Sequence, residues 1–209
     1  RELFSPKEQI SQAKRQRGLK RVNMETKKTS LFNLHQKYGA KFVEFAGYQM
    51  PIQYKDGIIQ EHKFTRSNCG VFDVSHMGEF LIKGPEALKL IQKLCSNDAA
   101  SLKIGQAQYT CLPNSTGGIV DDLIVYRLET DGFLMVVNAN NIEKDWNWIK
   151  SHNTFDVEMK DLSSQYSLLA IQGPKAIMAV KTSHGRSTDP SGRTGGVVDC
   201  QRIVLILLR

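Results

Sequence analysis

The sequence predicts an α+β protein in which antiparallel sheets carry flanking helices. Three observations support this fold class: segments with helical spacing alternate with strand-like segments, three consecutive strand candidates are joined by tight turns, and one strand–turn–helix pattern occurs twice. With 209 residues, of which 41% are hydrophobic, the chain can build one large domain or two small ones.

The helices are expected where apolar residues recur three or four positions apart. The first is expected to follow a cap at Thr29 or Ser30 and to end at Gly39. The remaining helices are expected near residues 56–68, after Pro85 and over residues 140–152.

The strands are expected where β-branched and aromatic residues gather between turn signals. The stretch "KFVEFAGYQMP" predicts one strand that ends at Pro51, and "GVFDVSH" and "GEFLIKG" predict two short ones. Three further stretches predict a meander of antiparallel hairpins, because the turns "PNSTGG" and "ETDG" join "QAQYTCL", "GIVDDLIVYRL" and "FLMVVNA". "FDVEMKDL" and "YSLLAIQG" predict two more strands.

One pattern occurs twice along the chain. "FLIKGPEALKLI" (80–91) and "LAIQGPKAIMAV" (169–180) both read as strand, Gly-Pro-x-Ala and helix. This repetition predicts two related α+β units, of which the second breaks off early. We therefore interpret residues 24–180 as one domain plus part of a second.

The two ends of the chain differ from its middle. Residues 1–23 carry a net charge of +5, which is typical of an organelle-targeting presequence or of a non-native, untranslated or disordered leader. Glu2, Glu8 and Met24 favour the second interpretation. Residues 181–209 predict a divergent, loop-like tail, whose final run "IVLILLR" has nothing left to pack against.

Charge and composition argue against several classes of protein. The net charge is +7, but residues 24–180 carry −1, so a nucleic-acid-binding protein is not expected. No run of 18 apolar residues occurs, so we expect no membrane-spanning helix. The four cysteines form no C-x-x-C pair, which favours reduced thiols over a disulfide or zinc framework.

Two adjacent carboxylates interrupt the strand "GIVDDLIVYRL". Because side chains alternate along a strand, Asp122 and Tyr126 share one face, about 13 Å apart, while Asp121 shares the other with Arg127. A carboxylate in an apolar cavity can position a proton, so Asp122 is the candidate catalytic residue and Asp121 a structural one near Arg127. Taken alone, the spacing also fits two aspartates that merely end the preceding turn in solvent.

Two other clusters of polar residues predict structural roles. "DVSH" holds the ingredients of a nucleophilic triad, but Asp73 and Ser75 point one way on a strand and His76 the other. His62 follows Glu61, and no second ligand occurs at metal spacing. We therefore expect neither a triad nor a metal site.

Five stretches, in this order, resemble the amino-terminal half of the aminomethyltransferase family, the T-protein of the glycine cleavage system. They are "FAGYQMPIQY", "GVFDVSHMGEF", "NSTGGIVDDLIVY", "VVNANNIEKDWNWI" and "AIQGPKA". The resemblance covers roughly Thr29 to Ala176, and five ordered stretches are far more specific than any single motif.

The resemblance implies a folate-binding aminomethyltransferase-like fold, truncated before its C-terminal β-barrel domain, and hence an incomplete chain with impaired activity. It implies an enzyme of one-carbon metabolism and glycine catabolism that uses tetrahydrofolate as co-substrate and no metal. The aminomethyl group would arrive on the lipoyl arm of a carrier, the H-protein; the methylene passes to tetrahydrofolate and ammonia is released. The implied location is cytoplasmic, or the mitochondrial matrix if the basic leader is a presequence.

The resemblance also implies roles for individual residues. Asp122 matches the aspartate assigned to catalysis, which orients folate and assists proton movement. The residues that match the lining of the folate pocket are Tyr109, Tyr126 and Asn138, with Met77 and Leu81 as apolar walls for the pterin. Strand alternation independently puts Asp122 and Tyr126 on one face, so the two arguments together favour catalysis over a solvent-exposed turn.

Three alternatives remain open from the sequence. The chain could be a non-catalytic folate-binding protein, or the folate module of a flavoenzyme that demethylates dimethylglycine or sarcosine. The absence of a Gly-rich dinucleotide motif before Thr29 counts against the flavoenzyme. The aperiodic tail also fits a gene product without activity.

Overall fold

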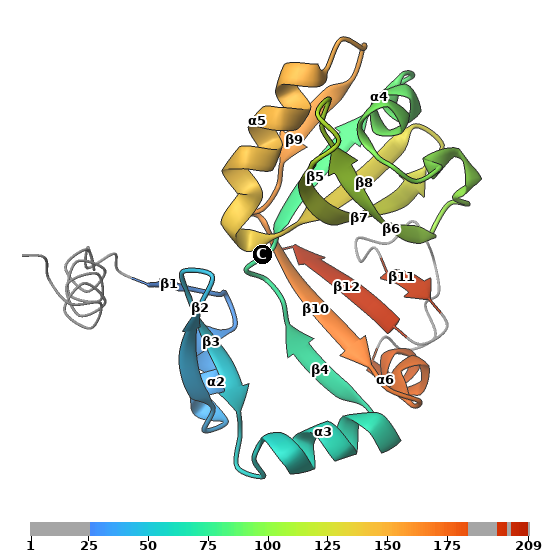
Figure 1. The fold of residues 1–209 in the computed structure, drawn as a ribbon. Coiled ribbons are helices and arrows are strands. Elements are labelled where there is room, and N and C mark those ends of the chain that lie inside the picture. The colour runs from blue at the N-terminus through green and yellow to red at the C-terminus, as the bar shows by residue number, and fades with distance from the viewer. Residues whose placement is uncertain (1–25, 184–195, 200–201, 209) are drawn as a thin grey trace, which may run out of the picture.

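The structure, a computed structural model, describes residues 26–183, 196–199 and 202–208. Figure 1 shows its elements, which in chain order are β1 (Lys27–Lys28), α2 (Phe32–Lys37), β2 (Lys41–Phe45), β3 (Tyr48–Gln53), α3 (Ile58–Ser67), β4 (Gly70–Asp73), β5 (Gly78–Lys83), α4 (Ala87–Leu94), η1 (Ala99–Ser101), β6 (Ala107–Pro113), β7 (Ile119–Glu129), β8 (Gly132–Val137), η2 (Ala139–Asn141), α5 (Ile142–His152), β9 (Glu158–Asp161), β10 (Tyr166–Gln172), α6 (Ala176–Ser183), β11 (Gly196–Asp199) and β12 (Arg202–Leu208).

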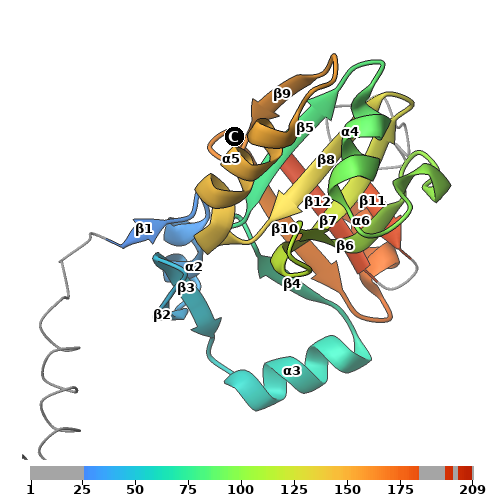
Figure 2. The ribbon, with the colours of Figure 1, turned by 45° about the horizontal axis from the view of Figure 1, so that its top comes forward.

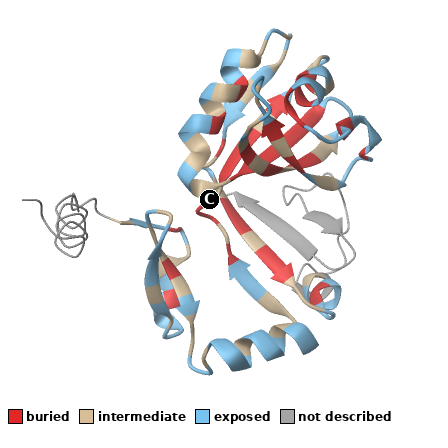
Figure 3. Ribbon diagram, in the orientation of Figure 1, coloured by how far each residue is buried: buried red, intermediate tan, exposed pale blue. Residues whose placement is uncertain are grey.

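A five-stranded sheet of order β6-β7-β8-β5-β9 forms the largest core, and all its neighbouring strands are antiparallel. The expected meander is its first part, β6-β7-β8. One face of the sheet packs against α4 and α5, where Phe80, Leu90 and Ile149 are completely buried (Figure 3). Alternation along the strands supplies this apolar face, and the helices supply the apolar stripes that cover it.

A second sheet, of order β11-β12-β10-β4, lies on the other side of the five-stranded sheet (Figure 2). Leu168 of β10 packs there with Tyr126, Leu134 and Val136. The predicted α+β fold with antiparallel sheets and flanking helices is therefore confirmed. The parallel pairing of β1 with β3 is a short exception.

The expectation that the terminal apolar run has nothing to pack against is wrong. Residues 202–208 form β12, which pairs with β10 along its whole length, from Tyr166↔Leu208 to Gln172↔Arg202. A β-branched and leucine-rich segment satisfies its backbone by covering the edge that β10 would otherwise expose. Residues 184–195 of the expected loop-like tail and the basic leader 1–23 lie outside the described residues.

The amino-terminal elements depart from the sequence-based expectations in two details. "KFVEFAGYQMP" forms the β2–β3 hairpin rather than one strand, because Ala46 (φ 50°) and Gly47 (φ 78°) make a tight two-residue turn. The expected caps of α2 bind elsewhere: Thr29 Oγ1 donates to Asp73 at 2.6 Å, and Ser30 Oγ lies 2.5 Å from Ser167 Oγ. Tertiary partners therefore replace the local cap.

The repeated strand–helix pattern has the same backbone geometry in both copies. Gly84 (φ 134°) and Gly173 (φ 115°) each accept a hydrogen bond from the amide three residues on, at 3.0 Å. A Cβ atom at Gly173 would lie 2.4 Å from the carbonyl oxygen of Thr65, so glycine is required there for close packing as well as for φ. The division of the chain into one domain plus part of a second remains a prediction.

Among the described residues, no helix has both the length and the apolar character needed to cross a bilayer.

Candidate functional site

The two aspartates of β7 face opposite sides of the five-stranded sheet. Leu123 and Val125, which share a face with Asp121, lie in the core under α4 and α5. Ile124 and Tyr126, which share a face with Asp122, pack in the second cluster, toward β10. The alternation predicted from the sequence is confirmed.

Asp122 is half-buried and hydrogen-bonded to a tyrosine of the neighbouring strand. The hydroxyl of Tyr109 donates to Asp122 Oδ2 at 2.5 Å, and the tyrosine side chain is 63% exposed. Tyr109 stands on β6 opposite Ile124, which places it on the face of Asp122. The hydrogen bond to Asp122, with smaller contributions from desolvation and nearby negative charge, raises the pKa of Tyr109 above its ordinary value.

Asn138, at the end of β8, connects the two aspartates. Its Nδ2 donates to the main-chain oxygen of Asp122 at 3.0 Å, to Asp121 Oδ1 at 3.2 Å and to Asp122 Oδ1 at 3.3 Å. Three oxygens around one nitrogen assign the amide orientation. The amide therefore holds the Asp122 carboxylate from the β8 side of β7, while Tyr109 holds it from the β6 side.

Asp121 is part of a buried polar cluster and not a partner of Arg127. The side chain is 8% exposed and hydrogen-bonds with Asp145, Asn141 and Asn138. Burial by itself would raise the pKa of Asp121, but these hydrogen bonds outweigh it and lower the pKa. Arg127 instead donates to the carbonyls of Leu102 and Thr130, since six residues along a strand, about 20 Å, separate it from Asp121.

The other predicted pocket residues extend along the same face of the sheet. Tyr126 pairs with Leu134, and Leu134 with Leu81, so all three form one row across β7, β8 and β5. Met77 precedes β5 and packs in the same cluster as Tyr126. Tyr126 is 3% exposed, and burial raises its pKa to about 12. The face thus has a polar end at Asp122 and an apolar end at Tyr126.

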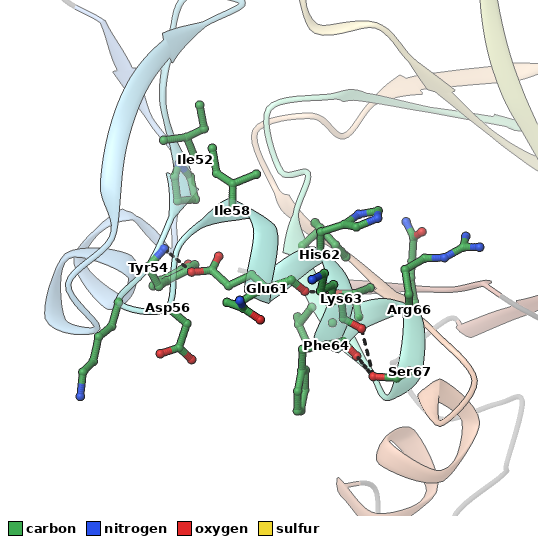
Figure 4. A pocket seen from close by; sticks show the side chains of 18 of the residues that line it. Ile52, Tyr54, Asp56, Ile58, Glu61, His62, Lys63, Phe64, Arg66 and Ser67 are labelled. Carbon is green, nitrogen blue, oxygen red and sulfur yellow. Dashed lines mark hydrogen bonds between the residues drawn. The ribbon is translucent and has the colours of Figure 1, made fainter.

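A separate cleft of about 1200 Å³ lies between β3, α3 and β4. Figure 4 shows His62, Lys63 and Arg66 of α3 among its lining side chains. None of the six predicted site residues lines this cleft. The cleft and the Asp122 face are therefore distinct places on the molecule.

Asp73, which lines the cleft, is held in a polar network that the sequence did not reveal. His35 Nε2 lies 2.9 Å from Asp73 Oδ2, and His35 Nδ1 lies 2.6 Å from the hydroxyl of Tyr54. Burial opposes ionisation of Asp73, but hydrogen bonds from Ser75, Thr29 and His35 outweigh it and lower its pKa. Ser75 Oγ binds the backbone of Leu168 rather than His76, which agrees with the structural role predicted for "DVSH".

A protein-family model, the GCVT N-terminal domain, matches residues 31–193. The chain belongs to this family. It is 60% identical over 156 residues to an aminomethyltransferase of Flavobacterium psychrophilum, a match that covers 75% of this chain and 43% of the relative. It is 57% identical over 151 residues to an aminomethyltransferase of Phocaeicola vulgatus, covering 72% of this chain and 42% of the relative.

A solved structure has the same fold. The glycine cleavage system aminomethyltransferase T from Bartonella henselae matches with a TM-score of 0.79 and 34% identity, over 88% of this chain and 54% of that chain. The chain therefore spans less than half the length of the curated relatives it matches. The predicted resemblance to the aminomethyltransferase family is confirmed.

Within this family domain, sequence reasoning missed Asp145. Asp145 is 0% exposed, on α5, and contacts Asp121. A signal was present: Asp145 lies three residues after Ile142 and four before Ile149, so a carboxylate falls within the apolar stripe of the helix. The Asp73–His35 pair had no such signal, because 38 residues separate its members.

Proposed function

We propose that this chain supplies the folate-facing part of an aminomethyltransferase of the glycine cleavage system. The observation that carries the proposal is the position of the Asp122 carboxylate, which Tyr109 and Asn138 hold by hydrogen bonds. It lies at the polar end of the sheet face that carries Tyr126 and packs only in part against β10, which we call the half-covered face. The names of the relatives at 57–60% identity support the same activity.

The residue types on this face fit tetrahydrofolate. A pterin is flat and amphipathic, and it suits aromatic and aliphatic walls with a few fixed polar groups. Tyr109 offers an exposed ring and hydroxyl, and Met77 and Leu81 offer partly buried apolar side chains. Tetrahydrofolate, when bound, supplies the nitrogens that accept the transferred methylene.

Asp122 would do two things in the transfer. Its carboxylate would orient the accepting nitrogen and receive or position the proton that this nitrogen loses on attack. Its negative charge would stabilise the positive charge that develops on the methylene carbon. Tyr109 and Asn138 would keep the carboxylate in place, since each binds one of its oxygens.

The donor proposed for the reaction is a lipoyl-bearing carrier, the H-protein. Cleavage of the carbon–sulfur bond would leave a dihydrolipoyl thiol, and the methylene would form bonds to two nitrogens of tetrahydrofolate. The two protons that these nitrogens lose would pass to the lipoyl sulfur and to the amine, which leaves as ammonia. The high identity to aminomethyltransferases favours this reaction over a non-catalytic folate-binding protein or a flavoenzyme module.

Calorimetric titration with tetrahydrofolate and an ammonia-release assay with aminomethylated carrier test the proposal. Asp122→Asn is expected to lower turnover by about 100-fold or more, and to change tetrahydrofolate affinity less. Asp131→Asn, in an exposed turn, is the matched control and should behave as the wild type. Equal turnover of the Asp122 variant and the wild type would remove Asp122 from the mechanism.

The same assay tests the expected impairment of activity. The wild-type rate is compared with that of the full-length Flavobacterium psychrophilum relative. A lower rate supports the expectation, and an equal rate contradicts it.

A further inference from the structure

The first turn of α5 is anchored on the start of β7, beside the twin aspartates. Lys144 Nζ donates to the carbonyl oxygen of Val120 at 2.6 Å. The next residue, Asp145, points into the covered face of the sheet and is completely buried. This arrangement brings the Asp145 carboxyl group against that of Asp121.

The two carboxyl groups are compatible with burial only if they share a proton. Among the described residues, neither oxygen of Asp145 accepts a hydrogen bond from an N–H or O–H group, and Lys144 Nζ lies 3.9 Å from Asp145 Oδ1, beyond hydrogen-bond distance. Two adjacent carboxylates repel each other strongly in a buried site, and the half-exposed Lys144 ammonium, 3.9 Å from Asp145 Oδ1, offsets this repulsion only in part. A single proton removes the repulsion and gives Asp145 a donor function toward Asp121.

Asp121 is in turn connected to Asp122 through one amide group. Asn138 Nδ2 has two hydrogens and three oxygen acceptors, two of which are the carboxylate atoms Asp121 Oδ1 and Asp122 Oδ1. The position of the amide therefore depends on where the Asp121 carboxylate is held. The connection runs through the sheet, from its helix-covered face to its half-covered face.

We propose that Asp145 is a positioning residue for Asp122: its protonated carboxyl group holds Asp121, Asp121 holds Asn138, and Asn138 fixes the Asp122 carboxylate. This inference concerns the geometry of the described residues. Only its consequence for aminomethyl transfer rests on the proposed function.

The electrostatic surroundings support this protonation state. Burial, together with the hydrogen bond to and repulsion from Asp121, raises the pKa of Asp145 to about 8. The ionisable groups facing it are Asp121 and Asp122 from β7 and Lys144 from its own helix; Asp122 adds to the rise and Lys144 opposes it. Loss of the proton above this pH places two charges in contact and disturbs the position of Asn138.

The sign of the effect on stability follows from the raised pKa. A carboxyl group whose pKa is higher in the folded state stabilises that state fully below its ordinary pKa of 3.8. That contribution declines as the pH rises and is lost once the pH passes about 8. Asp145→Asn keeps an N–H donor toward Asp121 but removes the titration, so its melting temperature should gain on the wild type as the pH rises.

The decisive measurement is the NMR signal of the Asn138 side-chain amide, followed in the whole chain from about pH 6 to about pH 10. We expect a titration step with a midpoint near the pKa of about 8 in the wild type and no step in Asp145→Asn. Asp145→Ala should displace the signal even at the lower pH, because Asp121 has lost its donor. Glu143→Gln, exposed on the same helical turn, should titrate as the wild type.

An unchanged step in Asp145→Asn, or no step in the wild type, would overturn the proposal. If Asp145→Ala does not fold, the Asn variant alone still decides, because it conserves size and the donor.

Turnover is a second readout that separates the two proposals. Asp145→Ala should lower kcat by about 10- to 100-fold, since a misplacement of about 1 Å has an effect of this size, and Asp145→Asn should restore most of the loss. Failure of the wild type to bind tetrahydrofolate in the calorimetric titration would contradict the proposed function and leave the amide titration as an independent test. Normal turnover in Asp145→Ala would contradict the positioning role.

Discussion

The two faces of the five-stranded sheet are covered to different extents. On one face, α4 and α5 close over a cluster in which Phe80, Leu90 and Val125 are completely buried. On the other face, Tyr126 and Val136 pack against β10, but Tyr109, beside Asp122, is 63% exposed. One sheet thus combines a closed core with a face that can receive a ligand.

The twin aspartates show what this difference does to identical side chains. Under the helices, Asp121 hydrogen-bonds with Asn138 and Asn141 and contacts Asp145, since a buried carboxylate without partners is costly. On the half-covered face, Asp122 is held by two groups and keeps access to the surface. Coverage, and not residue type, separates the structural aspartate from the candidate catalytic one.

Of the differences expected between the two faces, the largest is in how much each contributes to the free energy of unfolding. Phe80→Ala should destabilise the fold by about 3–5 kcal/mol, because Phe80 is completely buried and its ring meets Trp146 edge-on at 5.0 Å between centroids. Ile124→Ala, on the half-covered face, should lose at most about 2 kcal/mol. Urea unfolding measures both, and equal losses would show that the two faces contribute alike.

Thiol labelling compares the faces without changing the chain. Cys95 lies in the core under the helices, and burial raises its pKa to about 12. Cys111 stands opposite Asp122 and is half-buried. Iodoacetamide at about pH 8 should modify Cys95 at least about 100-fold more slowly than Cys111, as followed by peptide mass spectrometry. Urea should abolish the difference, and equal rates in the folded protein would contradict the coverage described for Cys95.

Replacing each aspartate by asparagine should affect stability unequally. Asp121→Asn should destabilise the protein by about 1–3 kcal/mol, because an amide NH₂ would then face the donors of Asn138 and Asn141. Asp122→Asn should cost less, because its side chain is half-buried. Thermal unfolding measures the two losses, with Asp131→Asn as a control for the charge change. A larger loss for Asp122 would reverse the assignment of roles.

The smallest expected effect is a change in one titration. Asp122→Asn should bring the pKa of Tyr109 down toward its ordinary value, because the charged acceptor that favours the neutral phenol is gone. Ultraviolet difference titration, with Tyr109→Phe to identify the signal, measures the shift. An unchanged Tyr109 titration would indicate that the hydrogen bond is absent in solution.

Much of the fold was predictable because its signals are local. The meander, α3, α4 and α5 follow from periodicity and turn residues, and the opposite faces of Asp121 and Asp122 follow from strand alternation alone. The errors arose where distant residues decide. Thr29 and Ser30, the expected cap residues of α2, bind Asp73 and Ser167 instead, and the terminal run pairs with β10.

The residues of the candidate site were also predictable only as far as local patterns and the family resemblance reach. The resemblance pointed to Asp122, Tyr109 and Asn138, and the structure brings these three together. The cluster behind them was not predicted, because Asp145 reaches Asp121 only after α5 has packed on the sheet. The expected contact of Asp121 with Arg127 was wrong because strand geometry separates them.

The sequence by itself determined the order of strands and helices, the family, and which face of β7 each aspartate takes, because these depend on local periodicity and on the residues themselves. Only the tertiary structure decided which face would be closed and which would stay accessible. Coverage depends on how distant segments such as α5 and β10 pack on the sheet, and through it on the desolvation and hydrogen bonds that each carboxylate meets.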